Sequence, residues 1–96
     1  MRNTTGLKPV PLSQVTLSGG FWAERQAVNR SVSVPVEYDR CQETGRLAVF
    51  DLNWKPQDSW RPHHFYDSDV AKWIEAAAYS LTTHPDPALE GQVDAV

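Results

Sequence analysis

The 96-residue sequence contains a single cysteine, Cys41, so it can form no internal disulfide. No second pair of cysteine or histidine ligands occurs at the spacing of a tetrahedral zinc site, so Cys41 would need ligands from elsewhere. The sequence also lacks the roughly 20 consecutive apolar residues of a membrane span. We therefore expect no metal site made by this chain alone and no contact with a membrane.

The sequence has no large excess of either charge. Nine basic and twelve acidic residues give a formal charge of −3, and no cluster of lysine or arginine could neutralise a run of phosphates, which argues against a nucleic-acid partner. The first residues lead into a proline-interrupted stretch and not into the apolar segment of a signal peptide, so we expect a cytoplasmic protein. With 41% hydrophobic and 22% charged residues, the composition is that of a soluble globular domain.

The first 20 residues have no sustained periodicity. Pro9 and Pro11 predict an extended lead-in, and residues 15–17 are a candidate short strand. After a glycine pair, residues 21–28 combine good helix formers with apolar positions at roughly helical spacing. The order expected here is therefore strand or extended segment, turn, and helix.

A second, short helix is predicted over residues 36–44. Pro35 suits the first turn of a helix, and Gly45 suits its carboxyl-terminal cap. The apolar run at residues 46–50 is too brief to assign, so strand and helix both stay open.

Residues 53–64 predict a long loop that carries two tryptophans, Trp54 and Trp60. Flat apolar rings with polar edges suit the faces of sugar rings as well as protein cores. Sugar binding and simple anchoring of the loop are therefore both open for these two side chains.

The clearest predicted element is an amphipathic helix over residues 69–82. Its apolar positions recur at helical spacing; they are Val70, Trp73, Ile74, Ala77, Ala78 and Leu81. Asp67 and Asp69 stand at its start, where short acidic side chains cap free amide groups. Because the residue before a proline is pushed away from helical geometry, His84 before Pro85 ends it.

A last helix is predicted to begin at Asp86-Pro87, an N-cap residue followed by proline at the first position. Leu89, Val93 and Val96 share one face of it. No stop signal follows, so we expect the sequence to be cut in mid-helix.

The possible catalytic groups are weak on their own. Asp67 and Asp69 could be the paired carboxylates of a glycosidase, which stand about 5 to 9.5 Å apart, but capping is the favoured role for two acids at a helix start. His63 and His64 are adjacent and share no helical face, so they do not define a metal site. Cys41 has no evident activating base. We therefore assign no catalytic residue within the chain.

Several motifs resemble one known family. The longest is Phe65-Tyr66-Asp67-Ser68-Asp69-Val70-Ala71-Lys72-Trp73, followed by His84-Pro85-Asp86-Pro87. Upstream stand Gly20-Phe21-Trp22 and Glu43-Thr44-Gly45-Arg46-Leu47. In this order and spacing they are similar to the opening of the catalytic domain of glycoside hydrolase family 127.

The resemblance implies a mostly α fold: an extended lead-in and short strand over residues 1–20, then the opening part of an (α/α)6 barrel over residues 21–96. It also implies a retaining β-L-arabinofuranosidase that depends on zinc and acts on carbohydrate. The zinc ligands, glutamate acid/base and cysteine nucleophile of the family match nothing in this chain, so the chain alone is expected to be inactive. The candidates for a substrate pocket are Asp67, Asp69, Trp60 and Tyr66.

Two other hypotheses stay open at the level of sequence. A small helical interaction module would use the aromatic loop as a docking surface. Another helical-barrel carbohydrate enzyme, such as a lyase or an unsaturated-uronide hydrolase, would share the architecture and not the chemistry. The oligomeric state is not predicted.

Overall fold

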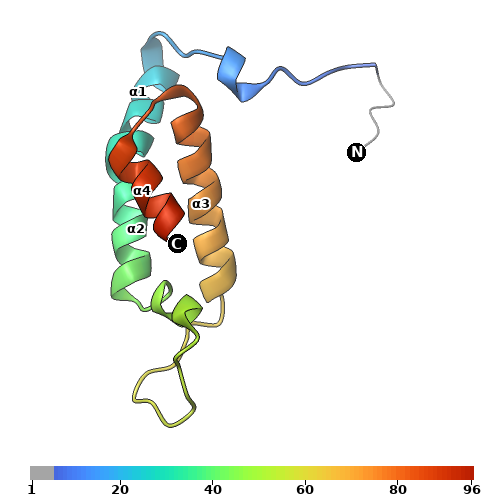
Figure 1. Cartoon of the computed structure of the whole chain (residues 1–96). Helices are drawn as coiled ribbons and strands as arrows, with labels where there is room; N and C mark the ends of the chain where they lie inside the picture. The colour runs from blue at the N-terminus through green and yellow to red at the C-terminus, as the bar shows by residue number, and fades with distance from the viewer. Residues whose placement is uncertain (1–5) are drawn as a thin grey trace.

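A computed structural model describes residues 6–96, and these residues form helices joined by turns and one long loop (Figure 1). The helices are η1 (Leu12–Gln14), α1 (Gly20–Val28), η2 (Asn29–Ser33), α2 (Val34–Glu43), η3 (Ala48–Asp51), α3 (Tyr66–Thr83) and α4 (Pro87–Ala95). The prediction of a mostly α fold is confirmed. The first five residues of the predicted lead-in lie outside the described part of the chain.

Of the two alternatives for residues 15–17, a short strand or an extended segment, the structure has the extended segment. Val15 has extended backbone angles, with φ −112° and ψ 124°, but none of residues 6–96 pairs with it as a second strand. A single extended segment leaves its ladder hydrogen bonds unmade, and a strand exists only where a partner supplies them. What precedes it is η1, a single 3-10 turn closed by the Val15 N–H donating to Leu12 O at 3.0 Å, which packs against α3.

The chain runs without a break from α1 through η2 into α2 (Figure 1). We predicted a separate helix beginning after Pro35, whereas α2 already begins at Val34. Proline has no N–H to donate and its ring crowds the carbonyl four residues earlier, and the wider π-helical turn of η2, immediately upstream, accommodates both effects. In that turn the Ser31 hydroxyl donates to Ala27 O at 2.8 Å.

The end of α2 is as predicted. Gly45 follows the last turn with φ +76°, a left-handed conformation that glycine adopts without the steric cost of a Cβ, and its N–H donates to Gln42 O at 3.2 Å. The apolar run after it, open between strand and helix, forms the 3-10 helix η3.

The core lies where α2, α3 and α4 meet. It consists of Val34 from α2, Trp73 and Ala77 from α3, and Leu89 from α4. The Trp73 indole Nε1–H donates to Val34 O at 3.0 Å, so the buried ring keeps its one polar group satisfied. Tyr38 packs on Trp73 with ring centroids 5.0 Å apart. The predicted apolar stripe therefore forms the core, except that Ala78 is exposed.

α3 and α4 begin differently. α3 starts at Tyr66, three residues before the predicted start, so Asp67 and Asp69 lie inside its first turn; the N-cap is Phe65, which makes no side-chain capping bond. α4 has the predicted cap, because Asp86 Oδ1 accepts from the N–H groups of Ala88 and Leu89, each at 3.1 Å. Within residues 6–96, no helix is long and apolar enough to cross a membrane.

α2 and α3 run antiparallel as a helical hairpin, α4 crosses it, and residues 52–65 form a loop that projects from the closed end (Figure 1). Such hairpins are the repeating unit of an (α/α) barrel, so the fold is consistent with part of one. The molecule is elongated, with a radius of gyration of 17.0 Å. A compact chain of this length would have about 12 to 13 Å.

Candidate functional site

The groove between α2 and α3 contains a pocket of about 570 Å³. Its lining includes five charged side chains and the thiol of Cys41. The charged ones are Glu37, Arg40, Arg46, Asp69 and Lys72. Charged groups that converge on one hollow between packed helices make this the place where the chain is best able to hold a polar ligand.

The strongest polar contact in the pocket is an ion pair between Arg46, just after α2, and Asp69, in the first turn of α3. Arg46 Nε lies 2.7 Å from Asp69 Oδ2, and the two side chains are only 18% and 35% exposed. The hydrogen bond from Arg46 lowers the pKa of Asp69 below its ordinary value, with further lowering from the charges of Arg46 and Lys72. Asp69 is thus an ionised acceptor, which suits a sugar hydroxyl and does not suit a general acid.

Asp67 and Asp69 have different surroundings. Asp67 is exposed and its Oδ1 accepts from the Ser68 N–H at 2.8 Å, so it satisfies one free amide in the first turn of α3. The capping role that we favoured for both acids is wrong, because Phe65 is the N-cap and neither acid stands there. The Asp69 carboxylate binds the guanidinium of Arg46 instead. Asp69 lines the pocket, and the two carboxylates do not face each other across a common hollow.

The aromatic candidates lie at the base of the loop. Tyr66 is half-buried and packs edge-on against Phe50 at 5.4 Å. The six-membered ring of Trp60 rests on Gly45, with its Cζ3 3.5 Å from where a Cβ on that glycine would stand. Trp54 donates its Nε1–H to Trp60 O at 2.8 Å. Anchoring of the loop is therefore part of what the two tryptophans do.

Cys41 is buried near the end of α2. Burial, as the main cause, raises the pKa of its thiol; Asp69 and Glu37 raise it further, while Arg46 acts in the opposite direction. A thiol held in its protonated form is a poor nucleophile and a poor metal ligand. The raised pKa gives no reason to assign Cys41 a catalytic role.

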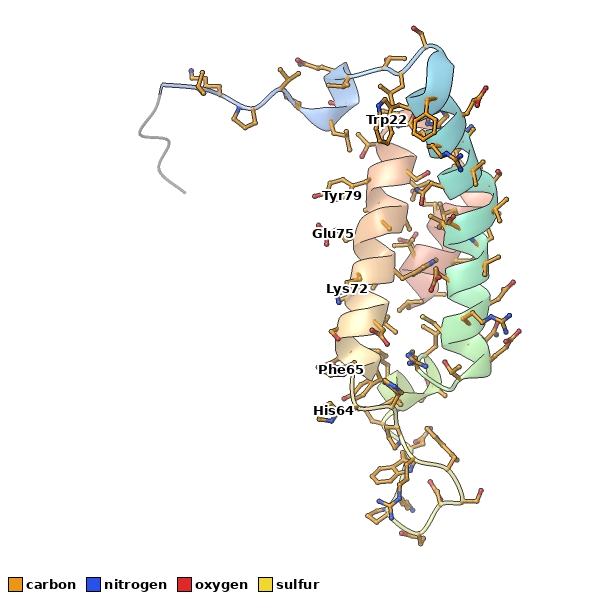
Figure 2. All side chains as sticks on the ribbon, turned by 180° about the vertical axis from the view of Figure 1, so that it is seen from behind. Trp22, His64, Phe65, Lys72, Glu75 and Tyr79 are labelled. Atoms are coloured by element: carbon orange, nitrogen blue, oxygen red, sulfur yellow. The ribbon has the colours of Figure 1, made fainter. Side chains whose placement is uncertain are left out.

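His63 and His64 belong to the loop and not to a ligand set. His63 Nδ1 accepts from the Phe65 N–H at 3.1 Å, and the His64 ring packs edge-on against Phe65. His64 and Phe65 lie at the base of α3, and Lys72, Glu75 and Tyr79 project along one edge of that helix (Figure 2). Within residues 6–96, no three histidine, cysteine or acidic side chains come together as a possible metal site.

Sequence reasoning did not single out Arg46 as a functional residue. It lies 23 positions from Asp69, so no local pattern links the two. One signal was available: a basic residue directly after a helix-ending glycine, followed by an acidic pair at the start of the next helix, is the arrangement that a closed helical hairpin brings together.

Comparison with known proteins places these features in a family. Residues 14–96 match the family model described as "Beta-L-arabinofuranosidase, GH127 catalytic domain". The chain belongs to this family. The match includes the pocket, the loop and the whole core, and it disfavours a free-standing interaction module.

One segment also has a characterised relative. Thirty residues are 60% identical to the "Non-reducing end beta-L-arabinofuranosidase" of Bifidobacterium longum subsp. longum. The aligned segment makes up 31% of this chain and 5% of that relative, so the chain corresponds to a small part of the relative's length. No solved structure matches the chain significantly.

Proposed function

We propose that this chain is part of a retaining glycoside hydrolase that removes β-L-arabinofuranosyl groups, or closely related sugars, from the non-reducing ends of glycans. The observation that carries the proposal is the family match over residues 14–96. The name of the bacterial relative supports the sugar and the end of the glycan. The role of this part of the enzyme is scaffold and pocket wall.

The chemical groups of the hairpin support that role. Retaining hydrolysis needs a nucleophile and a group that alternates between acid and base. Burial raises the pKa of the Cys41 thiol, which makes it a weaker nucleophile, and the carboxylate of Asp69 is bound to Arg46. We infer that the nucleophile and the acid/base come from other parts of the enzyme.

Zinc belongs to the same proposal. In the described part of the chain no three candidate ligands lie close together, so these residues do not fit a zinc site of their own. If the complete enzyme depends on zinc, its ligands lie in other parts of the enzyme.

Asp69 is the pocket candidate with the best support. An ionised carboxylate fixed by Arg46 can accept a hydrogen bond from a sugar hydroxyl without changing its own protonation. Tyr66, Trp60 and Asp67 are the further candidates, each at or near the loop. A cytoplasmic location is also part of the proposal; microscopy of the tagged complete protein would check it.

The test uses an aryl β-L-arabinofuranoside with the isolated 96 residues and with the complete enzyme. We expect no sugar release from the isolated chain. The complete enzyme should release arabinose with retention of configuration, as followed by NMR of the first-formed anomer, and a chelator should abolish the activity. Zinc-independent turnover by the purified 96-residue chain would overturn the proposal.

A further inference from the structure

The loop at residues 52–65 projects from the closed end of the hairpin, yet its base is firmly held. Two contacts join the segment before the loop to the segment after it: the Arg46–Asp69 ion pair and the edge-on packing of Phe50 against Tyr66. A third contact lies inside the loop, where the Asp58 N–H donates to Lys55 O and the Lys55 N–H to Asp58 Oδ2, each at 2.9 Å. The loop therefore enters binding with much of its conformational entropy already lost.

Within this loop, Trp60 is the aromatic side chain that is both held in place and partly exposed to solvent. The edge of its six-membered ring lies on Gly45, and its carbonyl accepts from Trp54, so both the ring and the backbone are fixed. The residue is nevertheless 38% exposed, and among residues 6–96 its Nε1–H has no hydrogen-bond partner. A fixed aromatic ring with an unused donor at its edge suits a ligand that has both an apolar face and hydroxyl groups.

The position of Trp60 relates it to the pocket. Gly45, on which the ring rests, stands between Thr44 and Arg46, and both of these neighbours line the pocket between α2 and α3. Trp60 itself is not part of that lining. The ring thus lies beside the pocket and is partly exposed, next to two residues of the pocket lining.

We propose that Trp60 stacks on the sugar ring on the leaving-group side of the cleaved bond, and that Gly45 is its positioning residue. This inference rests on the proposed glycosidase function. Gly45 has one requirement: its φ of +76° disfavours any side chain, whereas an added methyl group would only touch the indole, at 3.5 Å. The loop therefore sets preference among leaving groups and not the chemistry of the cleaved bond.

The experiment compares two substrates of the complete enzyme that share a terminal β-L-arabinofuranosyl group. One is the methyl glycoside, which has no ring on the leaving side; the other is a disaccharide with a second arabinofuranose there. Trp60→Ala should raise KM for the disaccharide about 2- to 10-fold, the range of one lost aromatic contact, and leave KM for the methyl glycoside unchanged. Trp60→Phe should restore most of the difference.

Two more variants separate stacking from loss of structure. Gly45→Ala should produce the same selective rise in KM, with kcat for the methyl glycoside retained, because a side chain at φ +76° strains the backbone on which the ring rests. Gln57→Ala, exposed at the tip of the loop, is the matched control and should change neither substrate. Equal effects of Trp60→Ala on both substrates, or no effect on either, would overturn the inference.

Failure of the proposed function would be visible separately. If the complete enzyme hydrolyses neither substrate, calorimetric titration with the disaccharide still decides the inference. Binding that weakens with Trp60→Ala and recovers with Trp60→Phe would support the stacking residue. Absence of binding, or binding insensitive to Trp60, would reject it.

Discussion

Two tryptophans of the chain differ in burial: one lies in the core and the other is exposed. Trp73, on α3, is 5% exposed and sits in the core between α2 and α4, whereas Trp22, on α1, is 69% exposed at the far end of α3 from the loop (Figure 2). Both rings carry the same apolar area, so residue type does not decide burial. What differs is that α2, α3 and α4 supply one another with a second layer, while nothing within residues 6–96 covers the outer side of α1.

The same contrast between covered and uncovered apolar side chains holds between the first third of the chain and the rest. The first third exposes a series of large hydrophobic side chains: Leu7, Val10, Leu12, Val15, Leu17, Phe21, Trp22, Val28 and Val32. The accessible surface of the chain is 7670 Å². A compact monomer of this mass would expose about 5,500 Å², so the chain as a whole exposes far more surface than a compact domain does.

The largest expected effect concerns the isolated chain. Because its first third lacks cover and its core consists of few residues, we expect the 96 residues alone to unfold without a sharp transition and to aggregate. Thermal scans by circular dichroism, with light scattering and sedimentation at several concentrations, would measure this. A cooperative transition from a stable monomer would show that the exposed apolar side chains of the first third need no cover.

The next largest effect is expected in the core formed by α2, α3 and α4. In the complete enzyme, Trp73→Ala removes the ring that fills the core and leaves Val34 O without its indole donor, so we expect a loss of roughly 3 to 5 kcal/mol in the free energy of unfolding. Denaturant unfolding measures it. Glu75→Ala, exposed on the same helix, is the control and should stay within about 0.5 kcal/mol of the parent. An unchanged unfolding midpoint for Trp73→Ala would contradict the assigned core.

A smaller effect is expected at the start of α4. Asp86→Ala leaves the N–H groups of Ala88 and Leu89 without their acceptor, at a cost of about 0.5 to 2 kcal/mol. Asp86→Asn keeps an oxygen acceptor and should recover most of that loss. Equal destabilisation by both substitutions would show that charge, and not capping, is what Asp86 provides.

These features differ in how far the sequence predicts them, and distance along the chain is the reason. The Asp86-Pro87 start of α4 and the apolar stripe of α3 are local signals, written within a few residues, and the structure confirms both. The unbroken passage from α1 to α2 was missed because a proline normally predicts a helix start, and only the π-helical turn before it shows that the helix continues.

The site was harder to predict than the fold. Asp69 was selected as a pocket candidate from its type and position, but its partner Arg46 comes from another element, and only the closed hairpin brings them to 2.7 Å. The support of Trp60 by Gly45 has the same origin, since the glycine was expected only as a helix cap. Contacts between elements depend on how the elements pack, which a local pattern does not contain.

The smallest effect is expected from the acidic pair, where one member lines the pocket and the other does not. In the complete enzyme, Asp69→Ala should weaken catalysis without unfolding the protein, because it removes a pocket carboxylate and frees Arg46. Asp67→Ala removes one acceptor within the first turn of α3 and should leave kcat/KM unchanged. Steady-state kinetics on both variants, beside their melting temperatures, measure this difference.

The pH dependence of stability gives a second way to test the pair. The pKa of Asp69 is lowered in the folded state, so its ion pair with Arg46 stabilises the fold at neutral pH, and this contribution disappears as the pH falls through that lowered value. In the complete enzyme, the difference in unfolding midpoint between the parent and Asp69→Asn should therefore be present near pH 7. It should shrink well below about pH 4, which is the ordinary pKa of an aspartate. Asp67→Asn, which leaves the Arg46–Asp69 ion pair intact, is measured beside it as the control for removing an acid from the first turn of α3. A difference that persists unchanged into strong acid would mean that Asp69 acts through its shape in the pocket and not through its charge.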